Sequence, residues 1–257
     1  MNLSVNEVYK LNEVKPGVLV LSVALIFGAS GSIGKAIYQY FHERGSRVIG
    51  VGRSNDSNLK AYLMEWIAWT GSESQLNQEL GIRLVDKKLD CVVWAQGMNF
   101  NDKISSFDST KHLQMYEANV VFILKSLHAI MGGNFLAQNA RLCIISSIWQ
   151  NIARQEKLSY CVTKSALQGL VQSLTVDLGR EGILVNAVLP GALDTPMTRS
   201  NLNSAQLENL ESATPLKSLA NLGDVAGLVH YLCSQDNTGI TGQFIAADRG
   251  FSNARIL

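Results

Sequence analysis

Tyr160 and Lys164 are separated by four positions in a segment whose apolar pattern predicts a helix over residues 158–181. That spacing puts the phenol and the ammonium on one helical face, about one turn apart. A phenol with a pKa of about 10 is a poor acid–base catalyst at neutral pH, but a nearby ammonium favours the phenolate and lowers that pKa. The pair could therefore support general acid–base catalysis, although a Tyr and a Lys at this spacing also occur by chance.

A glycine-rich stretch, Gly-Ala-Ser-Gly-Ser-Ile-Gly at residues 28–34, follows the apolar run 23–27 and precedes a predicted helix over 33–44. Glycines let such a loop turn tightly and bring backbone N–H groups to a pyrophosphate, at which the helix dipole also points. A structural loop without a ligand would use the same residues, so both interpretations stay open. Ser32 stands where the better-known loop has its middle glycine, and we expect Gly31 to supply the backbone freedom instead.

The end of the second predicted strand indicates which dinucleotide the loop would bind. Folds that prefer NAD carry an Asp or Glu there, bound to the ribose hydroxyls. This chain has Arg53 followed by Ser54. A guanidinium fits a 2′-phosphate through charge-assisted hydrogen bonds, so we predict that NADP(H) is preferred over NAD(H). The alternative is that Arg53 is a solvated cation at a strand end.

Strand-length apolar runs alternate with helical patterns along most of the chain. The runs are continuously apolar, as in parallel strands buried on both faces. The order predicts an α/β fold, a doubly wound parallel seven-stranded sheet (Rossmann fold) with helices on both faces, in a single domain. The predicted strands are 23–27, 47–51, 65–69, 90–95, 141–146, 183–188 and 243–247, and the predicted helices are 33–44, 58–63, 74–80, 110–130, 158–181 and 223–234.

Two segments stand apart from this alternation. Residues 1–22 form an N-terminal extension to the domain at 23–257, and residues 18–21 could be an extra strand or an arm across a neighbouring subunit. The polar, partly helical segment 197–217 lies between two prolines, and we expect it to be a substrate lid over a strand end.

Composition narrows the class of partner. The formal net charge of +1 in 257 residues gives no electrostatic reason to expect nucleic acid or an anionic membrane as partner. No apolar run reaches the roughly 20 residues of a membrane span, and no basic segment precedes the first run as in a secretory signal. We expect a cytoplasmic protein with free, mostly buried cysteines and no metal site. The four histidines, on predicted helices away from the other motifs, are expected to be surface or packing residues: His42, His112, His128 and His230.

Further motifs follow in a fixed order along the chain. Asn119 lies in a predicted helix, Ser146 and Ser147 close the strand before Tyr160, and Asn-Ala-Val-Leu-Pro-Gly at 186–191 precedes Asp-Thr-Pro at 194–196. Together with the glycine loop and the segments 239–242 and 247–250, this set resembles the short-chain dehydrogenase/reductase family over residues 23–252. Within that family the chain is most similar to the 3-oxoacyl-carrier-protein reductase type and its sugar- and alcohol-oxidising relatives.

The resemblance implies roles for these residues. Tyr160 would be the general acid–base, Ser147 would hydrogen-bond the carbonyl oxygen, and Lys164 would lower the pKa of Tyr160 and bind the nicotinamide ribose. Asn119 would hold a water in the proton relay through its helix backbone, and Thr195 would lie near the carboxamide. The hydride is the cofactor's chemistry. The cofactor contacts would be Gly28, Ser30, Gly31, Ser32, Ile33, Gly34, Arg53, Ser54, Ala95, Gly97, Tyr160, Lys164, Pro190, Gly191 and Thr195.

The segment between Ser147 and Tyr160 normally faces the substrate in this family. Here it carries Trp149, which could stack on a ring, and Arg154, which could meet an anionic group. Ordinary packing and a solvated cation are the alternatives for these two. Met98, Met197 and the lid would complete the pocket, although methionines often only fill gaps.

Four positions depart from the family pattern. Ser32 replaces a glycine of the loop, and Trp-Ala-Gln-Gly at 94–97 replaces Asn-Asn-Ala-Gly. No acid follows the third strand in Ile-Ala-Trp-Thr at 67–70, which weakens the expected adenine contact, and Arg249 replaces a glycine. No catalytic group is lost, so a divergent member is expected.

The predicted function is NADP-dependent interconversion of a ketone and a secondary alcohol, polar or sugar-like, in a homodimer or homotetramer. One alternative is a nucleotide-sugar epimerase or dehydratase, which shares the Gly-x-x-Gly-x-x-Gly loop; the short stretch after Gly250 argues against its larger substrate domain. Another is a catalytically silent NADP-binding regulatory protein, which the intact Tyr160 and Lys164 disfavour.

Overall fold

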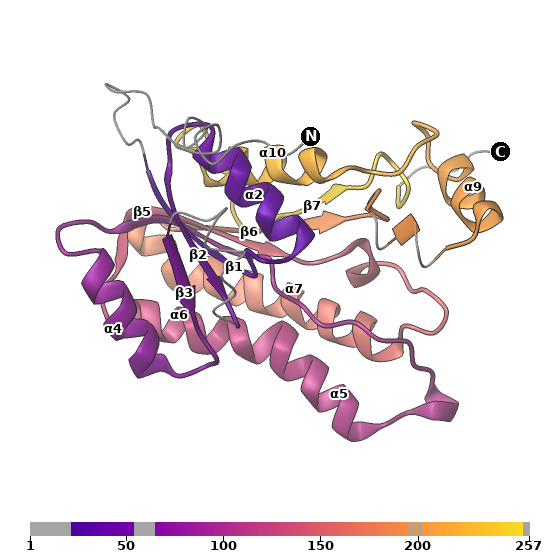
Figure 1. Cartoon of the computed structure of the whole chain (residues 1–257), viewed down its shortest axis with the longest axis horizontal. Coiled ribbons are helices and arrows are strands. Elements are labelled where there is room, and N and C mark those ends of the chain that lie inside the picture. The colour runs from indigo at the N-terminus through magenta and orange to yellow at the C-terminus, as the bar shows by residue number, and fades with distance from the viewer. Residues whose placement is uncertain (1–21, 54–64, 196–197, 200–201, 254–257) are drawn as a thin grey trace, which may run out of the picture.

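The computed structural model describes residues 22–53, 65–195, 198–199 and 202–253. Its centre is a seven-stranded sheet in the order β3-β2-β1-β4-β5-β6-β7, in which every pair of neighbours is parallel (Figure 1). This confirms the predicted fold class and all seven predicted strands. The strands are β1 (Val23–Phe27), β2 (Arg47–Gly52), β3 (Glu65–Ala68), β4 (Leu89–Trp94), β5 (Leu136–Ile145), β6 (Leu184–Pro190) and β7 (Phe244–Ala247).

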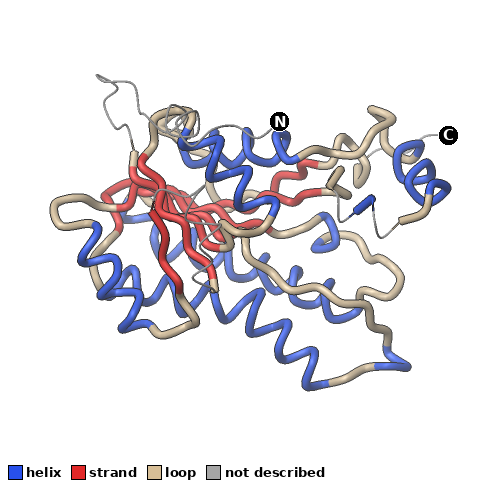
Figure 2. The backbone as a smooth tube through the Cα atoms, in the orientation of Figure 1, coloured by secondary structure: helices blue, strands red, loops and turns tan. Residues whose placement is uncertain are grey.

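Helices cover both faces of the sheet (Figures 1 and 2). On one face, α2 (Ser32–His42) and α10 (Leu222–Cys233) pack together. On the other lie α4 (Glu73–Arg83), α6 (Phe122–Gly132) and α7 (Leu158–Leu178). Two separate clusters of buried apolar residues, one under each layer, form the core. The doubly wound arrangement therefore follows from strands that are apolar on both sides.

The helix predicted over 110–130 is interrupted. It consists of α5 (Ser109–Tyr116), the π-helical turn η2 (Glu117–Val121) and α6. A π turn widens the helix by one residue and is frequent at functional sites. The segment that we predicted to be a lid contains α9 (Ser204–Ser212), and α7 ends in the short turn η4 (Gly179–Glu181). The predicted helix 58–63 and the predicted strand or arm 18–21 lie outside the described residues.

Trp94 explains one departure from the family pattern. It is fully buried at the end of β4, with its ring stacked on that of Phe27, 5.9 Å between centroids. Its Nε1–H donates to Ser126 Oγ at 2.8 Å. The polar contact expected from an asparagine is replaced by a stacked aromatic whose one donor is satisfied by α6.

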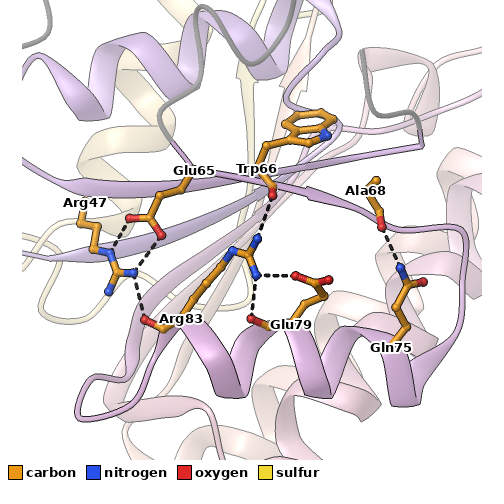
Figure 3. A network of polar contacts seen from close by, with 7 residues as sticks. All are labelled: Arg47, Glu65, Trp66, Ala68, Gln75, Glu79 and Arg83. Atoms are coloured by element: carbon orange, nitrogen blue, oxygen red, sulfur yellow. Dashed lines mark hydrogen bonds and ion pairs between the residues drawn. The ribbon is translucent and has the colours of Figure 1, made fainter. Parts of the chain in front are cut away.

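A polar network fixes the edge strand β3 to its neighbours (Figure 3). Arg47 on β2 makes a bidentate ion pair with Glu65, with N–O distances of 2.6 and 2.8 Å. It also donates to the carbonyl of Arg83. Arg83 in turn donates to the carbonyl of Trp66 at 3.1 Å and pairs with Glu79. Bidentate arginine pairs are geometrically specific, so this network sets where α4 and the start of β3 lie.

Two further observations concern the cysteines and the possibility of a membrane-spanning helix. All four cysteines are free, with Cys91, Cys143 and Cys233 buried and Cys161 partly buried. No helix in the described part of the chain is long and apolar enough to cross a membrane.

Candidate active site at the carboxyl ends of the strands

The predicted catalytic residues come from three elements that meet at the carboxyl edge of the sheet. Tyr160 and Lys164 lie in the first two turns of α7, Ser147 follows β5, and Asn119 lies in η2. In open α/β sheets this edge is where ligands bind. The structure therefore brings together the four residues that the sequence singled out.

Tyr160 hydrogen-bonds Ser147, which also accepts from the backbone N–H of Trp149 at 3.3 Å. Burial raises the pKa of Tyr160 to about 12, and the hydrogen bond with Ser147 opposes that rise. The net lowering expected from Lys164 is not found, because the desolvation of the phenolate is the largest effect. In this environment Tyr160 carries its proton throughout the neutral range.

Lys164 is buried, and its Nζ donates to the carbonyl oxygen of Ile145 at 3.0 Å. Its Nζ lies 5.7 Å from the centre of the Tyr160 ring. Burial lowers the pKa of Lys164 to about 8. The ammonium is thus held close to the phenol and remains mostly charged at neutral pH.

The side chain of Asn119 is fully engaged. Its Oδ1 accepts from Met98 N at 2.7 Å, and its Nδ2 donates to Met98 O and to Thr163 Oγ1, both at 3.0 Å. These bonds tie η2 to the segment after β4 and to α7. A Cβ on Gly97 would lie only 3.3 Å from Asn119 Oδ1, so a glycine allows this close approach. The expected water contact of Asn119 would have to use its backbone, and that role stays a prediction.

The glycine loop forms a cradle that side chains would fill. Gly28 has a left-handed φ of 72°, and a Cβ there would lie 2.5 Å from the backbone nitrogen of Gln96. A Cβ on Gly34 would lie 2.2 Å from the carbonyl oxygen of Gly28. Gly31 caps α2 without a side-chain hydrogen bond, which leaves the N–H groups of the first turn available. The loop therefore fits the pyrophosphate of a dinucleotide.

The expectation about Gly31 is wrong in one respect. Its φ of −77° and ψ of 162° are extended values that any residue adopts, so it does not supply special backbone freedom. Ser32 is simply the first residue of α2, where a serine is tolerated as well as a glycine. The loop tolerates Ser32 because the positions at which a side chain would clash are Gly28 and Gly34.

Two predicted cofactor contacts, Ser30 and Arg53, lie around the end of β2. Both are exposed, and a Cβ on Gly52, next to Arg53, would lie 3.4 Å from Ser30 Oγ. Ser54 lies outside the described residues. Ala95 lies on the opposite flank of the loop, where its N–H donates to the carbonyl of Phe27 at 3.0 Å.

The neighbouring Gln96 offers an unused polar group. Both polar atoms of its side chain are buried without a hydrogen-bond partner among the described residues. Buried amides are normally paired, so this side chain is available to a ligand in the loop. The buried amide supports the fit of a dinucleotide to this part of the molecule.

A cavity of about 680 Å³ opens beside the end of β3. Thr70, Gly71 and Met98 line it together with residues of α5 and η2. Met98, which we predicted to face the substrate, thus lies next to the segment expected to receive the adenine. Trp69, in the stretch 67–70 that lacks the expected acid, is buried in the core and donates its Nε1–H to the carbonyl of Ser72 at 2.6 Å. It supplies packing in place of a polar adenine contact.

The residues expected near the nicotinamide follow β6. Pro190 ends that strand, and a Cβ on Gly191 would lie 2.7 Å from the Cβ of Asp248, so the C-terminal segment passes unusually close there. Thr195 Oγ1 accepts from the N–H of Thr198 at 3.2 Å, just before the predicted lid segment 197–217. Met197 lies outside the described residues.

The candidate substrate wall contains one residue that the sequence did not indicate. Trp149 packs edge-to-face against Phe251, with centroids 6.3 Å apart, and the guanidinium carbon of Arg154 lies 5.9 Å from the Trp149 ring centre. Phe251 lies far along the chain from the other site residues, and no motif marks it. Arg249 keeps the left-handed backbone of a glycine, with φ 55°, and ion-pairs with Asp224 at 2.8 Å.

The expectation that His112 lies away from the motif residues is wrong. Its Nδ1 lies 2.8 Å from Ser159 Oγ, and Ser159 immediately precedes Tyr160. The other three histidines keep the surface or packing roles expected of them. His128 pairs with Glu73 at an exposed position, His42 contacts Tyr38, and His230 packs on Phe41.

Comparisons with known proteins agree with this geometry. A family described as Enoyl-(Acyl carrier protein) reductase matches residues 28–252. The chain is 31% identical over 242 residues to the 3-oxoacyl-[acyl-carrier-protein] reductase FabG of Rickettsia felis, covering 88% of this chain and 95% of the relative. It is 26% identical over 238 residues to FabG of Escherichia coli K12, covering 89% and 96%.

Solved structures show the same fold. A gluconate 5-dehydrogenase from Burkholderia cenocepacia, in complex with NADP and tartrate, superposes with a TM-score of 0.82 at 19% identity, covering 92% of this chain and 97% of that chain. At that identity the likeness concerns the fold alone. The family match, by contrast, spans nearly the whole described part of the chain and includes every catalytic candidate.

Proposed function

The chain belongs to the short-chain dehydrogenase/reductase family of NAD(P)-dependent oxidoreductases, and we propose that it reduces a ketone to a secondary alcohol with NADPH, using Tyr160 as general acid. The observation that supports this most is the meeting of Tyr160, Ser147 and Lys164 at the carboxyl edge of the sheet, beside a glycine cradle for a dinucleotide.

In the proposed reaction, Ser147 and Tyr160 hydrogen-bond the carbonyl oxygen and hold it toward the cofactor side of the site. A bound NADPH would supply the hydride that the carbonyl carbon needs. The O–H bond of Tyr160 breaks and its proton passes to the alkoxide oxygen. Lys164 stabilises the phenolate left on Tyr160 until a proton returns from solvent, for which the backbone of Asn119 would hold a water.

The protonation state of Tyr160 suits the role of proton donor. The raised pKa of Tyr160, about 12, keeps the phenol protonated at neutral pH, as a proton donor must be. Alcohol oxidation would need the phenolate, which the same burial disfavours. The pair is therefore set for proton donation unless the pH is high.

The preference for NADPH rests on the end of β2. Arg53 is exposed directly after β2, in the place where an acid would repel a 2′-phosphate, and a Cβ on the preceding Gly52 would lie 3.4 Å from Ser30 Oγ. A guanidinium and a hydroxyl around the end of β2 give that phosphate both a charge and a donor. Ser54 is proposed as a further contact.

For the substrate we propose a polar ketone that carries a ring or an anionic group. Trp149 with Phe251 offers an aromatic wall, and Arg154 a cation at its rim. Met197 and the segment carrying α9 would cover it. The names of the R. felis and E. coli relatives add 3-oxoacyl thioesters to the compounds worth testing.

A homodimer or homotetramer is part of the proposal. Leu113 on α5 and Val162 on α7 are 65% and 45% exposed although apolar, which suits helices that pair between subunits. Light scattering during size-exclusion chromatography tests this, and a monomer at micromolar concentration would contradict it. A cytoplasmic location stays a prediction.

The experiment is a screen of NADPH oxidation with simple ketones, keto-sugars and 3-oxoacyl thioesters. Turnover with any of them supports the proposal, whereas tight NADPH binding without turnover would favour the regulatory alternative. Conversion of a nucleotide sugar without net NADPH oxidation would favour the epimerase alternative.

A further inference from the structure

The start of α7 is capped from a different part of the chain. Its own N-cap residue, Lys157, makes no side-chain cap hydrogen bond. Instead Asp102, which follows β4 and is buried, accepts from Ser159 N at 3.0 Å and from Ser159 Oγ, while its backbone carbonyl accepts from Leu158 N at 3.3 Å. A carboxylate at a helix N-terminus satisfies orphan donors and interacts favourably with the dipole.

His112 on α5 completes this arrangement. Ser159 has one hydroxyl proton, and it goes to Asp102 Oδ2. Ser159 Oγ can therefore only accept from His112 Nδ1, 2.8 Å away, so Nδ1 carries a proton. The hydrogen bonds run in one direction, from His112 through Ser159 to Asp102.

This His–Ser–Asp set is not a nucleophilic triad. In such a triad the histidine lies between the serine and the acid, whereas here Ser159 lies in the middle. Ser159 is also 0% exposed, so no substrate reaches its hydroxyl. The set must act through the backbone that it holds.

That backbone belongs to the residue before Tyr160. We propose that His112 is a positioning residue for Tyr160: by donating to Ser159 it strengthens the Asp102 cap and fixes the first turn of α7, and with it the phenol, relative to Ser147. The proposal rests on the proposed function for its effect on turnover, but its effect on the helix start does not. A second set of hydrogen bonds joins the same two segments: Lys157 Nζ donates to Asn99 Oδ1 at 2.8 Å and to Asn101 Oδ1 at 2.6 Å, which also ties the start of α7 to the segment after β4.

The test uses two variants, of which only one keeps a hydrogen-bond donor at position 112. His112→Phe keeps an aromatic ring beside Phe107, 5.5 Å away in the wild type, but removes the donor. His112→Asn keeps a donor near the position of Nδ1. We expect His112→Phe to lower kcat about tenfold, the effect of one hydrogen bond, with an unchanged Kd for NADPH, and His112→Asn to restore at least half of the wild-type kcat.

Amide hydrogen exchange tests the proposal independently of turnover. Exchange at residues 158–161 should be about tenfold faster in His112→Phe than in the wild type or His112→Asn, while exchange in α2 stays unchanged. If the wild type reduces no ketone, the proposed function fails and the exchange result still decides the positioning claim. Wild-type exchange and kcat in a folded His112→Phe, or an Asn variant as impaired as the Phe variant, would overturn it.

Discussion

The ammonium of Lys164 lies 5.7 Å from the centre of the Tyr160 ring while it donates to the carbonyl of Ile145. The two groups therefore share one buried environment, which shifts their pKa values in opposite directions. Burial raises the pKa of Tyr160 to about 12 and lowers that of Lys164 to about 8. The neutral range is thus the range in which the phenol has its proton and the lysine its charge.

The first prediction concerns pH. The charge on Lys164 is present below a pH of about 8 and lost above it, whereas Tyr160 stays protonated until far higher pH. The kcat for ketone reduction should therefore be level near neutral pH and decrease as the pH rises through about 8. In Lys164→Arg, whose charge does not titrate, any residual activity should lack this decrease. A wild-type rate that increases through pH 8 would contradict the assigned roles.

The second prediction concerns the glycine loop. In Gly34→Ala the new Cβ would lie 2.2 Å from the carbonyl oxygen of Gly28, so the loop must move. We expect the Kd for NADPH to rise at least about a hundredfold, since the backbone donors at the helix start would be displaced. Gly81→Ala on α4 is the control, because a Cβ there would meet nothing within 4 Å. Isothermal titration calorimetry checks both, and equal Kd values for the two variants would refute the cradle.

The third prediction concerns cofactor preference. Arg53→Ala should raise the Kd for NADPH about tenfold or more and leave the Kd for NADH nearly unchanged, because only NADPH has the 2′-phosphate. Arg180→Ala, an exposed cation at the other end of the sheet, serves as control and should change neither value. Equal losses for NADPH and NADH in Arg53→Ala would show that Arg53 does not read the phosphate.

Much of this fold could be predicted because each strand is a continuous apolar run and helices follow in regular alternation. The interruption of the helix over 110–130 could not, because a π turn shifts the apolar pattern by a single residue. The contacts of Trp94 and Ser126, and of Trp149 and Phe251, join residues far apart in sequence. Such pairs depend on packing across elements and leave no local pattern.

In the site, too, some features follow from the sequence and others only from the folded structure. The meeting of Tyr160, Lys164, Ser147 and Asn119 at one edge of the sheet could be predicted because their types and order are typical of a known family, and their catalytic roles stay a proposal. His112 was missed because an isolated histidine on a helix has no motif, and only the fold places it on Ser159. The pKa of Tyr160 was expected to be lowered because spacing shows which charge is near but not how much water is excluded.

The fourth prediction concerns stability. Ser126→Ala removes the acceptor of the buried Trp94 Nε1–H and should lower the free energy of unfolding by about 1–3 kcal/mol. Ser173→Ala on the exposed side of α7 should have almost no effect. Urea denaturation followed by fluorescence measures both changes. A loss confined to activity, with unchanged stability, would show that the Trp94–Ser126 bond contributes little to folding.

The central claim is that Tyr160 donates the proton in an NADPH-dependent reduction, and replacement of its hydroxyl tests it most directly. NADPH oxidation should be measured for the wild type and Tyr160→Phe with the best substrate of the screen, together with the Kd for NADPH from fluorescence titration. We predict that kcat decreases at least about a hundredfold, the contribution of general acid catalysis, while the Kd changes less than about twofold. Wild-type turnover in a folded Tyr160→Phe variant would contradict the account.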